Sequence, residues 1–159
     1  GLRVGIAWQG NPNADVDRRR SVPLAQFAPI FDVPGAAFVS LQAGHGVEQI
    51  ATAPFGPRIA QFGPDLDADG AFVDTAAIMA GLDLVITSDT ATAHLAGALG
   101  VPSFVLLQQV PDWRWLRDRE DTPFYPSVRL FRQSVRGDWS GPARRAAEAL
   151  AALIGENAQ

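Results

Sequence analysis

The sequence predicts an α/β fold: a Rossmann-like parallel sheet with helices on both faces. Leu84–Thr87 and Ser103–Leu107 are almost continuously apolar, which is typical of strands buried on both faces of a parallel sheet. Between them, Thr90–Leu99 is rich in alanine and leucine, and it is followed by Gly100 and Pro102, which are typical of a helix end. A strand, a helix and a second strand in this order indicate a parallel crossover.

The remaining elements follow from the same kinds of pattern. Three further strands are expected at Leu2–Trp8, Ala37–Leu41 and Val128–Phe131. Three further helices are expected at Leu24–Phe31, Asp74–Ala80 and Pro142–Ile154. Pro29 predicts that the first of these is short or kinked, and Asp74 or Thr75 is expected near the N-cap of the second. Proline lies in the first turn of the third.

The segment Gln108–Pro126 interrupts the alternation of strands and helices. It contains Trp113, Trp115 and Tyr125, and it is longer than most connections in a compact domain. We interpret it as an ordered functional or interface loop, with simple packing of its aromatic residues as the equal alternative.

The length and composition are those of one globular domain. The chain has 159 residues, 47% of them hydrophobic and 19% charged, and no apolar run approaches the length that spans a bilayer. The first residues resemble a strand rather than a basic segment followed by a long apolar one, so no signal peptide is expected. We therefore expect a soluble, cytoplasmic protein.

The residue types that are missing exclude several mechanisms. The chain has no cysteine, which excludes disulfides, thiolate metal sites and a cysteine nucleophile. All 13 basic residues are arginine, so neither a Schiff-base lysine nor a P-loop lysine is available. The net charge of -4 is opposite to that expected of a nucleic-acid-binding domain. Any anionic ligand must therefore be bound by local features.

The loop after Leu84–Thr87 is a candidate phosphate site. Ligands of open α/β sheets bind outside the carboxyl ends of the strands. Here Ser88–His94 places hydroxyls and backbone amides at a helix start, which suits a phosphate. Asp89 can cap the helix or hold a ribose hydroxyl, and His94 lies one turn into the helix. The alternative is that Ser88 and Asp89 only cap the helix and that His94 is an interior histidine.

The loop after Leu2–Trp8 is a second candidate. Gln9–Asn13 can form a tight loop near a ligand, and the arginines of Arg18–Ser21 can hold phosphate oxygens. Alternatively, these arginines form a solvated face and are neutralised by Asp15 and Asp17. The sequence contains no G-x-G-x-x-G fingerprint, no G-x-S-x-G motif and no histidine pair at metal-ligand spacing.

A resemblance to a known family adds to this interpretation. Ser88–Pro102 resembles the D-[TS]-[GA]-x-x-H-[LI]-x-x-A-L-G-x-P signature of glycosyltransferase family 9, the heptosyltransferase-like family. Leu2–Gly10, Arg20–Pro23 and Phe38–Gln42 follow the family pattern in the expected order. In addition, Pro111–Trp115 and Asp118–Asp121 resemble the related domains that follow tetratricopeptide repeats in bacterial proteins.

The resemblance implies a role and a set of site residues. Residues 1–159 would be a single nucleotide-sugar-binding domain, the donor half of a metal-independent GT-B glycosyltransferase, excised from a longer chain with an N-terminal acceptor-binding domain. The implied binding residues are Asn11, Arg20, Gln42, Glu48, Asp89, Thr90, Ala91 and His94. Arg20 would contact the phosphates and Glu48 the nucleoside, and residues 89–94 would hold the diphosphate and the adjoining sugar. No cofactor and no catalytic residue are expected in this chain.

Two other classes of protein remain as alternatives. One is a non-catalytic nucleotide-sensing or scaffold module attached to peptide-binding repeats, because the catalytic base is expected outside this chain. The other is a receiver-like or flavodoxin-like domain, which lacks support because no acidic pocket follows the first predicted strand. Asp65, Asp67 and Asp69 alternate in a D-x-D-x-D pattern, which we interpret as a solvated turn rather than a metal site.

Overall fold

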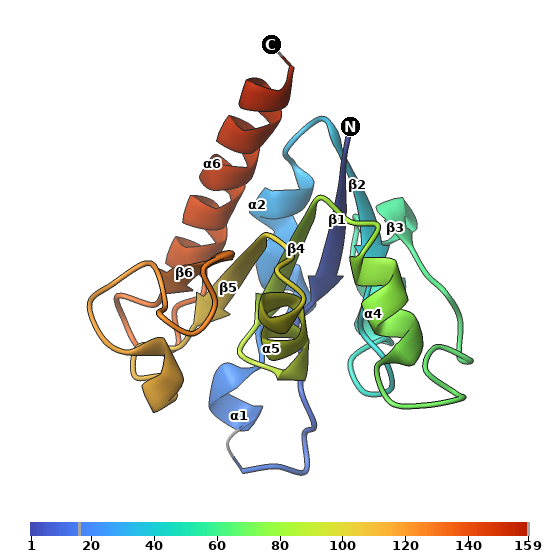
Figure 1. The fold of residues 1–159 in the computed structure, drawn as a ribbon, viewed down its shortest axis with the longest axis horizontal. Coiled ribbons are helices and arrows are strands. Elements are labelled where there is room, and N and C mark those ends of the chain that lie inside the picture. The colour runs from blue at the N-terminus through green and yellow to red at the C-terminus, as the bar shows by residue number, and fades with distance from the viewer. Residues whose placement is uncertain (16, 159) are drawn as a thin grey trace.

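A parallel β-sheet forms the centre of the computed structural model, which describes residues 1–15 and 17–158 (Figure 1). Within these residues the sheet has six strands in the order β3-β2-β1-β4-β5-β6, and every neighbouring pair is parallel. The strands are β1 (Leu2–Ala7), β2 (Ala36–Ser40), β3 (Ile59–Ala60), β4 (Leu84–Ser88), β5 (Ser103–Leu107) and β6 (Val128–Arg132). This confirms the predicted fold class, and the five predicted strands are found within one residue at each end.

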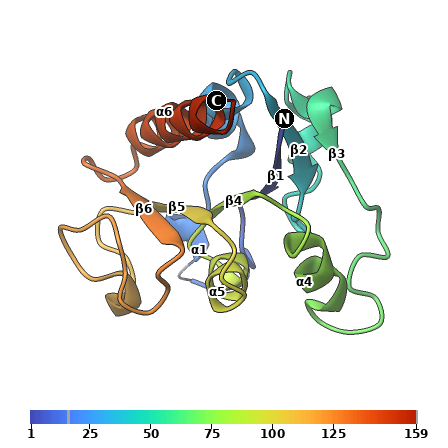
Figure 2. The same cartoon turned by 45° about the horizontal axis from the view of Figure 1, so that its top comes forward.

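Helices cover both faces of the sheet (Figure 2). One face packs against the 3-10 helix η1 (Leu24–Phe27), α2 (Ala28–Phe31) and α6 (Ser140–Asn157), and the other packs against α4 (Val73–Met79) and α5 (Ala91–Ala98). Two short helices, α1 (Asp17–Arg20) and α3 (Gln49–Thr52), lie in the loops after β1 and β2. No helix among the described residues is long and apolar enough to cross a membrane.

The core is divided by the sheet. Trp8, Phe31 and Leu150 belong to the larger cluster on the α2 and α6 face, whereas Met79 belongs to a smaller cluster beneath α4 and α5. All five residues of β4 are buried, and so are all five of β5. Burial on both faces explains why these two strands are apolar without alternation.

The predicted helix over residues 24–31 is divided into two elements. η1 ends at Phe27, and α2 begins at Ala28 with Pro29 in its first turn. Proline has no amide hydrogen, so it is compatible with the start of a helix and not with its interior. The predicted shortening at Pro29 is therefore confirmed, in the form of a restart.

Asp74 and Thr75 lie in the first turn of α4, near its N-cap as expected. The cap is Phe72, which has a left-handed φ of 65° and makes no side-chain capping bond. A carboxylate from the preceding loop replaces it: Asp67 accepts hydrogen bonds from the Thr75 amide at 3.0 Å and the Thr75 hydroxyl at 2.5 Å. Asp67 is therefore part of a folded turn rather than a solvated one, although Asp65 and Asp69 are exposed as predicted.

The predicted end of α5 is confirmed. Gly100 has a φ of 70° and donates its amide hydrogen to the Gly97 carbonyl, while the Val101 amide bonds to the Ala96 carbonyl. This pair of bonds is a Schellman motif, which requires a left-handed residue and therefore favours glycine.

The segment Gln108–Pro126 contains one short 3-10 helix, η3 (Trp113–Trp115). Trp115 is fully buried and packs against Leu107 and Val128, whereas Trp113 is 66% exposed. The segment is therefore ordered by packing at Trp115, and it presents Trp113 at its surface.

Candidate functional site

A cleft of about 410 Å³ lies at the carboxyl ends of β2, β1 and β4, and we call it the first cleft. The strand register brings three loops together there, because Ala7 of β1 pairs with Thr87 of β4 and Ile6 of β1 pairs with Ser40 of β2. The residues that line it are Gln9, Gly10, Asn11, Arg20, Leu41, Gln42, Ala43, Gly44, His45, Asp67, Phe72, Thr75, Thr90, Ala91 and Thr92. Five predicted site residues are thus brought together: Asn11, Arg20, Gln42, Thr90 and Ala91. Asp89, His94 and Glu48 do not line this cleft.

The start of α5 opens into the first cleft. Thr90 is the N-cap residue, with extended backbone, and its side chain makes no capping hydrogen bond. Ala91, the first helical residue, is exposed. The first amides of a helix lack partners within it and carry partial positive charge. The alternative that Ser88 and Asp89 only cap this helix is therefore wrong.

Buried polar atoms without a hydrogen-bond partner gather beside this helix start. Among the described residues there are seven such side-chain atoms, and three of them belong to residues at or beside the carboxyl end of β4: Arg20 Nε, Ser88 Oγ and Thr90 Oγ1. Two more, Asp89 Oδ2 and Trp115 Nε1, belong to side chains that face each other, because a hydrogen bond from Trp115 opposes the rise that burial causes in the pKa of Asp89. An unpaired buried polar group costs about 1–3 kcal/mol, so native structures contain few of them. The concentration of the first three at one place indicates that a ligand or water completes their bonding.

Asp89 lies beneath the floor of the site, with only 1% of its surface exposed. Burial raises the pKa of its carboxyl above the usual value, and the nearby Trp115, Arg20 and His94 side chains oppose this effect. Its Oδ1 atom is 4.0 Å from His94 Nε2. Asp89 therefore does not line the cleft itself, and it influences the cleft through its interactions with Arg20, His94 and Trp115.

His94 belongs to an aromatic cluster behind α5. Its Nδ1 atom is 3.0 Å from the Tyr125 hydroxyl, and its ring stacks on Trp115 with 5.1 Å between the centroids. Burial lowers the pKa of His94 below 6.5, against the opposing effect of Asp89. Tyr125 and Trp115 hold the His94 ring, while 34% of its side chain is exposed, so the phosphate contact implied for His94 stays a prediction.

The Gln42 side chain connects the loop after β1 to the loop after β2. Its side-chain oxygen accepts hydrogen bonds from the Trp8 and Gln9 amides, both at 3.0 Å. Its side-chain nitrogen donates to the Gln9 and His45 carbonyls, both at 2.8 Å. Because all its bonding capacity is used, Gln42 shapes the cleft wall rather than offering free polar atoms to a ligand.

Asp17 holds the loop after β1, which disagrees with the alternative that it neutralises the neighbouring arginines. It is 3% exposed, and its carboxylate accepts hydrogen bonds from the Gly10 amide at 3.1 Å and the Ser21 hydroxyl at 2.8 Å. A Cβ atom at Gly10 would overlap this carboxylate, which explains the glycine. With Asp17 turned inward, Arg20 lines the first cleft without an ion-pair partner among the described residues.

Glu48 is placed away from the first cleft. It is exposed, it is the N-cap residue of α3, and it accepts a hydrogen bond from the Gly46 amide at 2.9 Å. The nucleoside contact implied for Glu48 is therefore not supported by its position.

The part of the cleft wall that sequence reasoning missed comes mainly from the loop before α4. Asp67, Phe72 and Thr75 line the cleft because this loop folds back over the carboxyl end of β2. Partial burial raises the pKa of Asp67, but hydrogen bonds from Thr75 and from backbone amides outweigh it, so the pKa lies below its usual value. The D-x-D-x-D pattern was the one sequence feature that could have indicated Asp67 as a cleft residue. Among the described residues, no three His, Asp or Glu side chains are grouped as metal ligands.

Comparison with known proteins supports the fold assignment. The chain superposes on E. coli ADP-heptose lps heptosyltransferase II with a TM-score of 0.65 and 17% identity, over 99% of this chain and 48% of that one. Two structures of E. coli heptosyltransferase WaaC, one with ADP-2-deoxy-2-fluoro heptose and one with ADP, give TM-scores of 0.56 and 0.57, each over 44% of their length. The fold therefore matches about half of these enzymes.

One curated relative matches in sequence. Protein FlbA of Caulobacter vibrioides is 41% identical over 154 residues, which cover 94% of this chain and 25% of that protein. The chain thus spans about a quarter of this relative. No protein-family model matches the chain.

Proposed function

We propose that the first cleft binds the diphosphate of a nucleotide-diphosphate sugar, and that the chain is the donor-binding half of a metal-independent glycosyltransferase. The observation that carries this proposal is the group of unpartnered polar atoms at the open start of α5. Thr90 Oγ1 and Arg20 Nε are buried without partners next to exposed helix amides. A diphosphate is the ligand that accepts from all these donors at once.

Each group has a distinct part in the proposed mechanism. The Ala91 amide and the Thr90 hydroxyl donate hydrogen bonds to phosphate oxygens, and the Arg20 guanidinium balances their charge. As the bond from the sugar to the diphosphate breaks, negative charge grows on the leaving group. Fixed donors stabilise that charge without a cation. Asp89 and His94 support the helix start from behind, and Gln42 and Asp17 fix the facing loops.

The fold comparisons support the ligand class. The WaaC structures, which share this fold, are described as complexes with ADP and with ADP-2-deoxy-2-fluoro heptose. Because the matched part is about half of each enzyme, we propose that transfer requires a second, acceptor-binding half facing the cleft.

A second candidate is a nucleotide-binding module without transfer activity, attached to peptide-binding repeats. The state of Asp67 is compatible with both candidates. Asp67 is the one carboxylate among the described residues that line the cleft, and hydrogen bonds from Thr75 lower its pKa. A carboxylate held in this way is a weak base, so the chain alone offers no strong carboxylate base at the site.

Calorimetry tests the shared part of both candidates. ADP, UDP and GDP are titrated into the chain in EDTA and then in magnesium. We expect weak binding of at least one nucleotide, because the proposed acceptor-binding half does not contribute to it. Magnesium should not strengthen this binding, because protein groups supply the positive charge at the phosphates. No heat of binding at millimolar nucleotide would contradict both candidates. A separate assay of sugar release from a donor, with and without the full-length protein's remaining sequence, distinguishes transfer from binding alone.

A further inference from the structure

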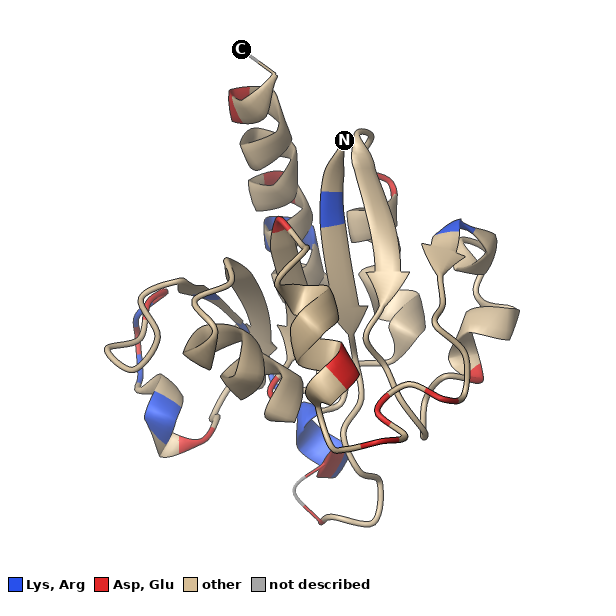
Figure 3. Ribbon diagram, turned by 45° about the vertical axis from the view of Figure 1, so that its right-hand side comes forward, with Lys and Arg blue, Asp and Glu red and all other residues tan. Residues whose placement is uncertain are grey.

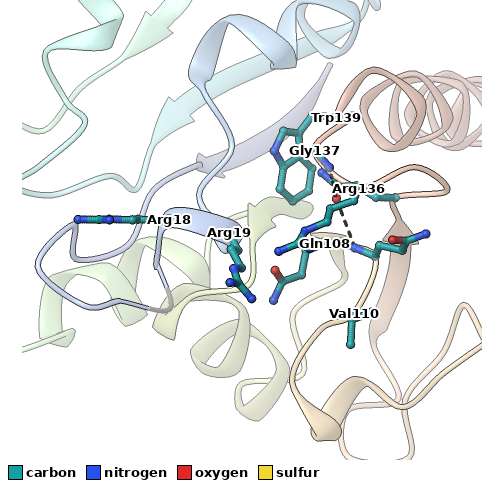
Figure 4. A pocket seen from close by; sticks show the side chains of 9 residues that line it. Arg18, Arg19, Gln108, Val110, Arg136, Gly137 and Trp139 are labelled. Carbon is teal, nitrogen blue, oxygen red and sulfur yellow. Dashed lines mark hydrogen bonds between the residues drawn. The ribbon is translucent and has the colours of Figure 1, made fainter.

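A second cleft, of about 520 Å³, lies beside α1 (Figure 4). It is formed by α1 and by the loops that follow β5 and β6, at the same edge of the sheet as the first cleft. Its lining residues are Arg18, Arg19, Gln108, Gln109, Val110, Gln133, Arg136, Gly137 and Trp139. Arg18 and Arg19 belong to the arginine run that the sequence offered as candidate phosphate ligands, whereas the other lining residues were not candidates.

The second cleft is locally basic in an acidic chain. Three of its lining residues are arginines, no Asp or Glu is among them, and the chain as a whole has a net charge of -4. None of the three arginines pairs with a carboxylate in residues 1–15 and 17–158. Figure 3 shows α1 as a basic segment at this edge, whereas the acidic residues lie mostly in other loops.

The arginines reach the cleft from two different elements. Figure 4 shows Arg19 from α1 and Arg136 from the loop after β6 extending toward the same space beside the Gln108 amide, with Arg18 farther out. Like charges that share a cleft without a counter-ion repel each other, so an anion between them is stabilising.

The wall of this cleft is held by hydrogen bonds rather than left as a free loop. Gln133, which is 4% exposed, accepts hydrogen bonds from the Gln109 amide at 3.3 Å and the Gly137 amide at 3.1 Å. The Gln109 side chain donates to the Ser134 carbonyl at 3.1 Å. Trp139, 8% exposed, lines the cleft at the start of α6. These contacts fix the loops after β5 and β6 relative to each other.

We propose that the second cleft binds a multiply charged oxyanion, a phosphate or a polycarboxylate, of a ligand distinct from the nucleotide. Arg19 and Arg136 hold the charge from opposite sides, the Gln108 amide donates a hydrogen bond, and Val110 and Trp139 supply an apolar wall. This site goes beyond the proposed nucleotide site: Arg20 lines one cleft and Arg18 and Arg19 the other, so both anions would lie beside α1.

The test uses nuclear magnetic resonance of the ¹⁵N-labelled chain, with inorganic pyrophosphate and citrate as separate probes. The Gly137 amide and the Trp139 indole report the second cleft, and the Gly44 amide reports the first. We expect saturable shifts at Gly137 and Trp139 with at least one probe, and the tighter probe identifies a phosphate or a polycarboxylate ligand. These shifts should persist when ADP saturates the first cleft, and they do not depend on whether ADP binds.

Charge-removing variants make the test specific. Arg19→Gln and Arg136→Gln should each weaken probe binding at Gly137 by about tenfold or more, with unchanged melting temperature. Arg58→Gln removes the same charge at an exposed position outside both clefts and should leave the affinity unchanged. The absence of saturable shifts at Gly137 with both probes would overturn the proposal. So would equal weakening by Arg58→Gln, which would indicate non-specific attraction.

Discussion

The imidazole of His94 and the phenol of Tyr125 are joined by a hydrogen bond, with 3.0 Å between Nδ1 and the hydroxyl oxygen. This bond connects α5 to the segment that precedes β6. The His94 ring also stacks on Trp115, and the centroids of the Trp115 and Tyr125 rings are 6.1 Å apart. The helix whose start opens into the first cleft is therefore anchored from behind by three aromatic side chains.

We predict that His94→Ala acts on stability more than on binding. Loss of the stacking contact and of the hydrogen bond should lower the free energy of unfolding by about 1–3 kcal/mol. Affinity for ADP should fall only slightly, because His94 does not line the first cleft. Chemical denaturation and calorimetry on the same samples measure both quantities. A large loss of affinity with unchanged stability would support the phosphate contact implied for His94.

Arg20→Ala should act on ADP affinity more than on stability, the reverse of His94→Ala. Arg20 ends the short helix α1 and is only partly buried, so its removal should leave the melting temperature unchanged. Removing a charge-assisted contact to phosphate costs about 1.5–3 kcal/mol, or roughly 10- to 100-fold in affinity. The matched control is Arg58→Ala, which removes the same charge from an exposed position away from the cleft. Equal effects of the two variants would refute a specific role for Arg20.

The buried Asp89 predicts a pH-dependent stability difference. Burial raises its pKa above 3.8 in the folded chain, so the folded chain holds this proton more tightly than the unfolded chain does. The resulting stabilisation is fully present below pH 3.8 and is lost as the pH rises through the folded pKa. Asp89→Asn does not titrate, so its stability relative to the wild type should improve as the pH rises from about 4 toward neutral.

Denaturation of wild type and Asp89→Asn across this pH range is the measurement. Burial lowers the pKa of His94 and the Asp89 carboxylate opposes this effect, so both proteins also carry His94→Gln, which removes this coupled titration from the difference. A difference that is constant with pH, or that changes in the other direction, would mean that Asp89 is not held in a desolvated environment.

An element could be predicted from the sequence when its own residues define it, and it was missed when contacts with residues elsewhere in the chain define it. β4 and β5 were predicted because burial on both faces leaves a continuous apolar run. β3 was missed because Ile59–Ala60 is too short to show a pattern, and its pairing with β2 defines it. The contact of Asp67 with the first turn of α4 was missed because Asp67 reaches Thr75 through a turn with positive φ at Asp67 and Phe72.

The same distinction applies to the site. Parallel topology alone brings Arg20, Thr90 and Ala91 to one edge of the sheet, so their meeting was predictable from the order of the strands. The position of His94 depends on Trp115 and Tyr125, which follow a later strand and carry no motif. The second cleft was missed for a similar reason, since its arginines come from loops distant in sequence.

The packing of α5 predicts an effect for a small substitution. A Cβ atom at Gly97 would overlap the Tyr125 ring, so Gly97→Ala must displace Tyr125 or the helix. We expect a loss of about 1–3 kcal/mol in the free energy of unfolding. Gly155→Ala is the control: it lies in α6 with open space around it, and alanine should stabilise that helix by about 0.5–1 kcal/mol. Equal effects at both positions would contradict the packing of Tyr125 on Gly97.

The central claim is that the first cleft binds a diphosphate at the start of α5. The most direct measurement is a crystal structure of the chain with ADP, or with UDP or GDP if calorimetry ranks one of them higher, grown without divalent metal. We expect phosphate oxygens within hydrogen-bonding distance of the Thr90 hydroxyl, the Ala91 amide and the Arg20 guanidinium. A nucleotide bound elsewhere, or in this cleft with its phosphates turned away from α5, would contradict it.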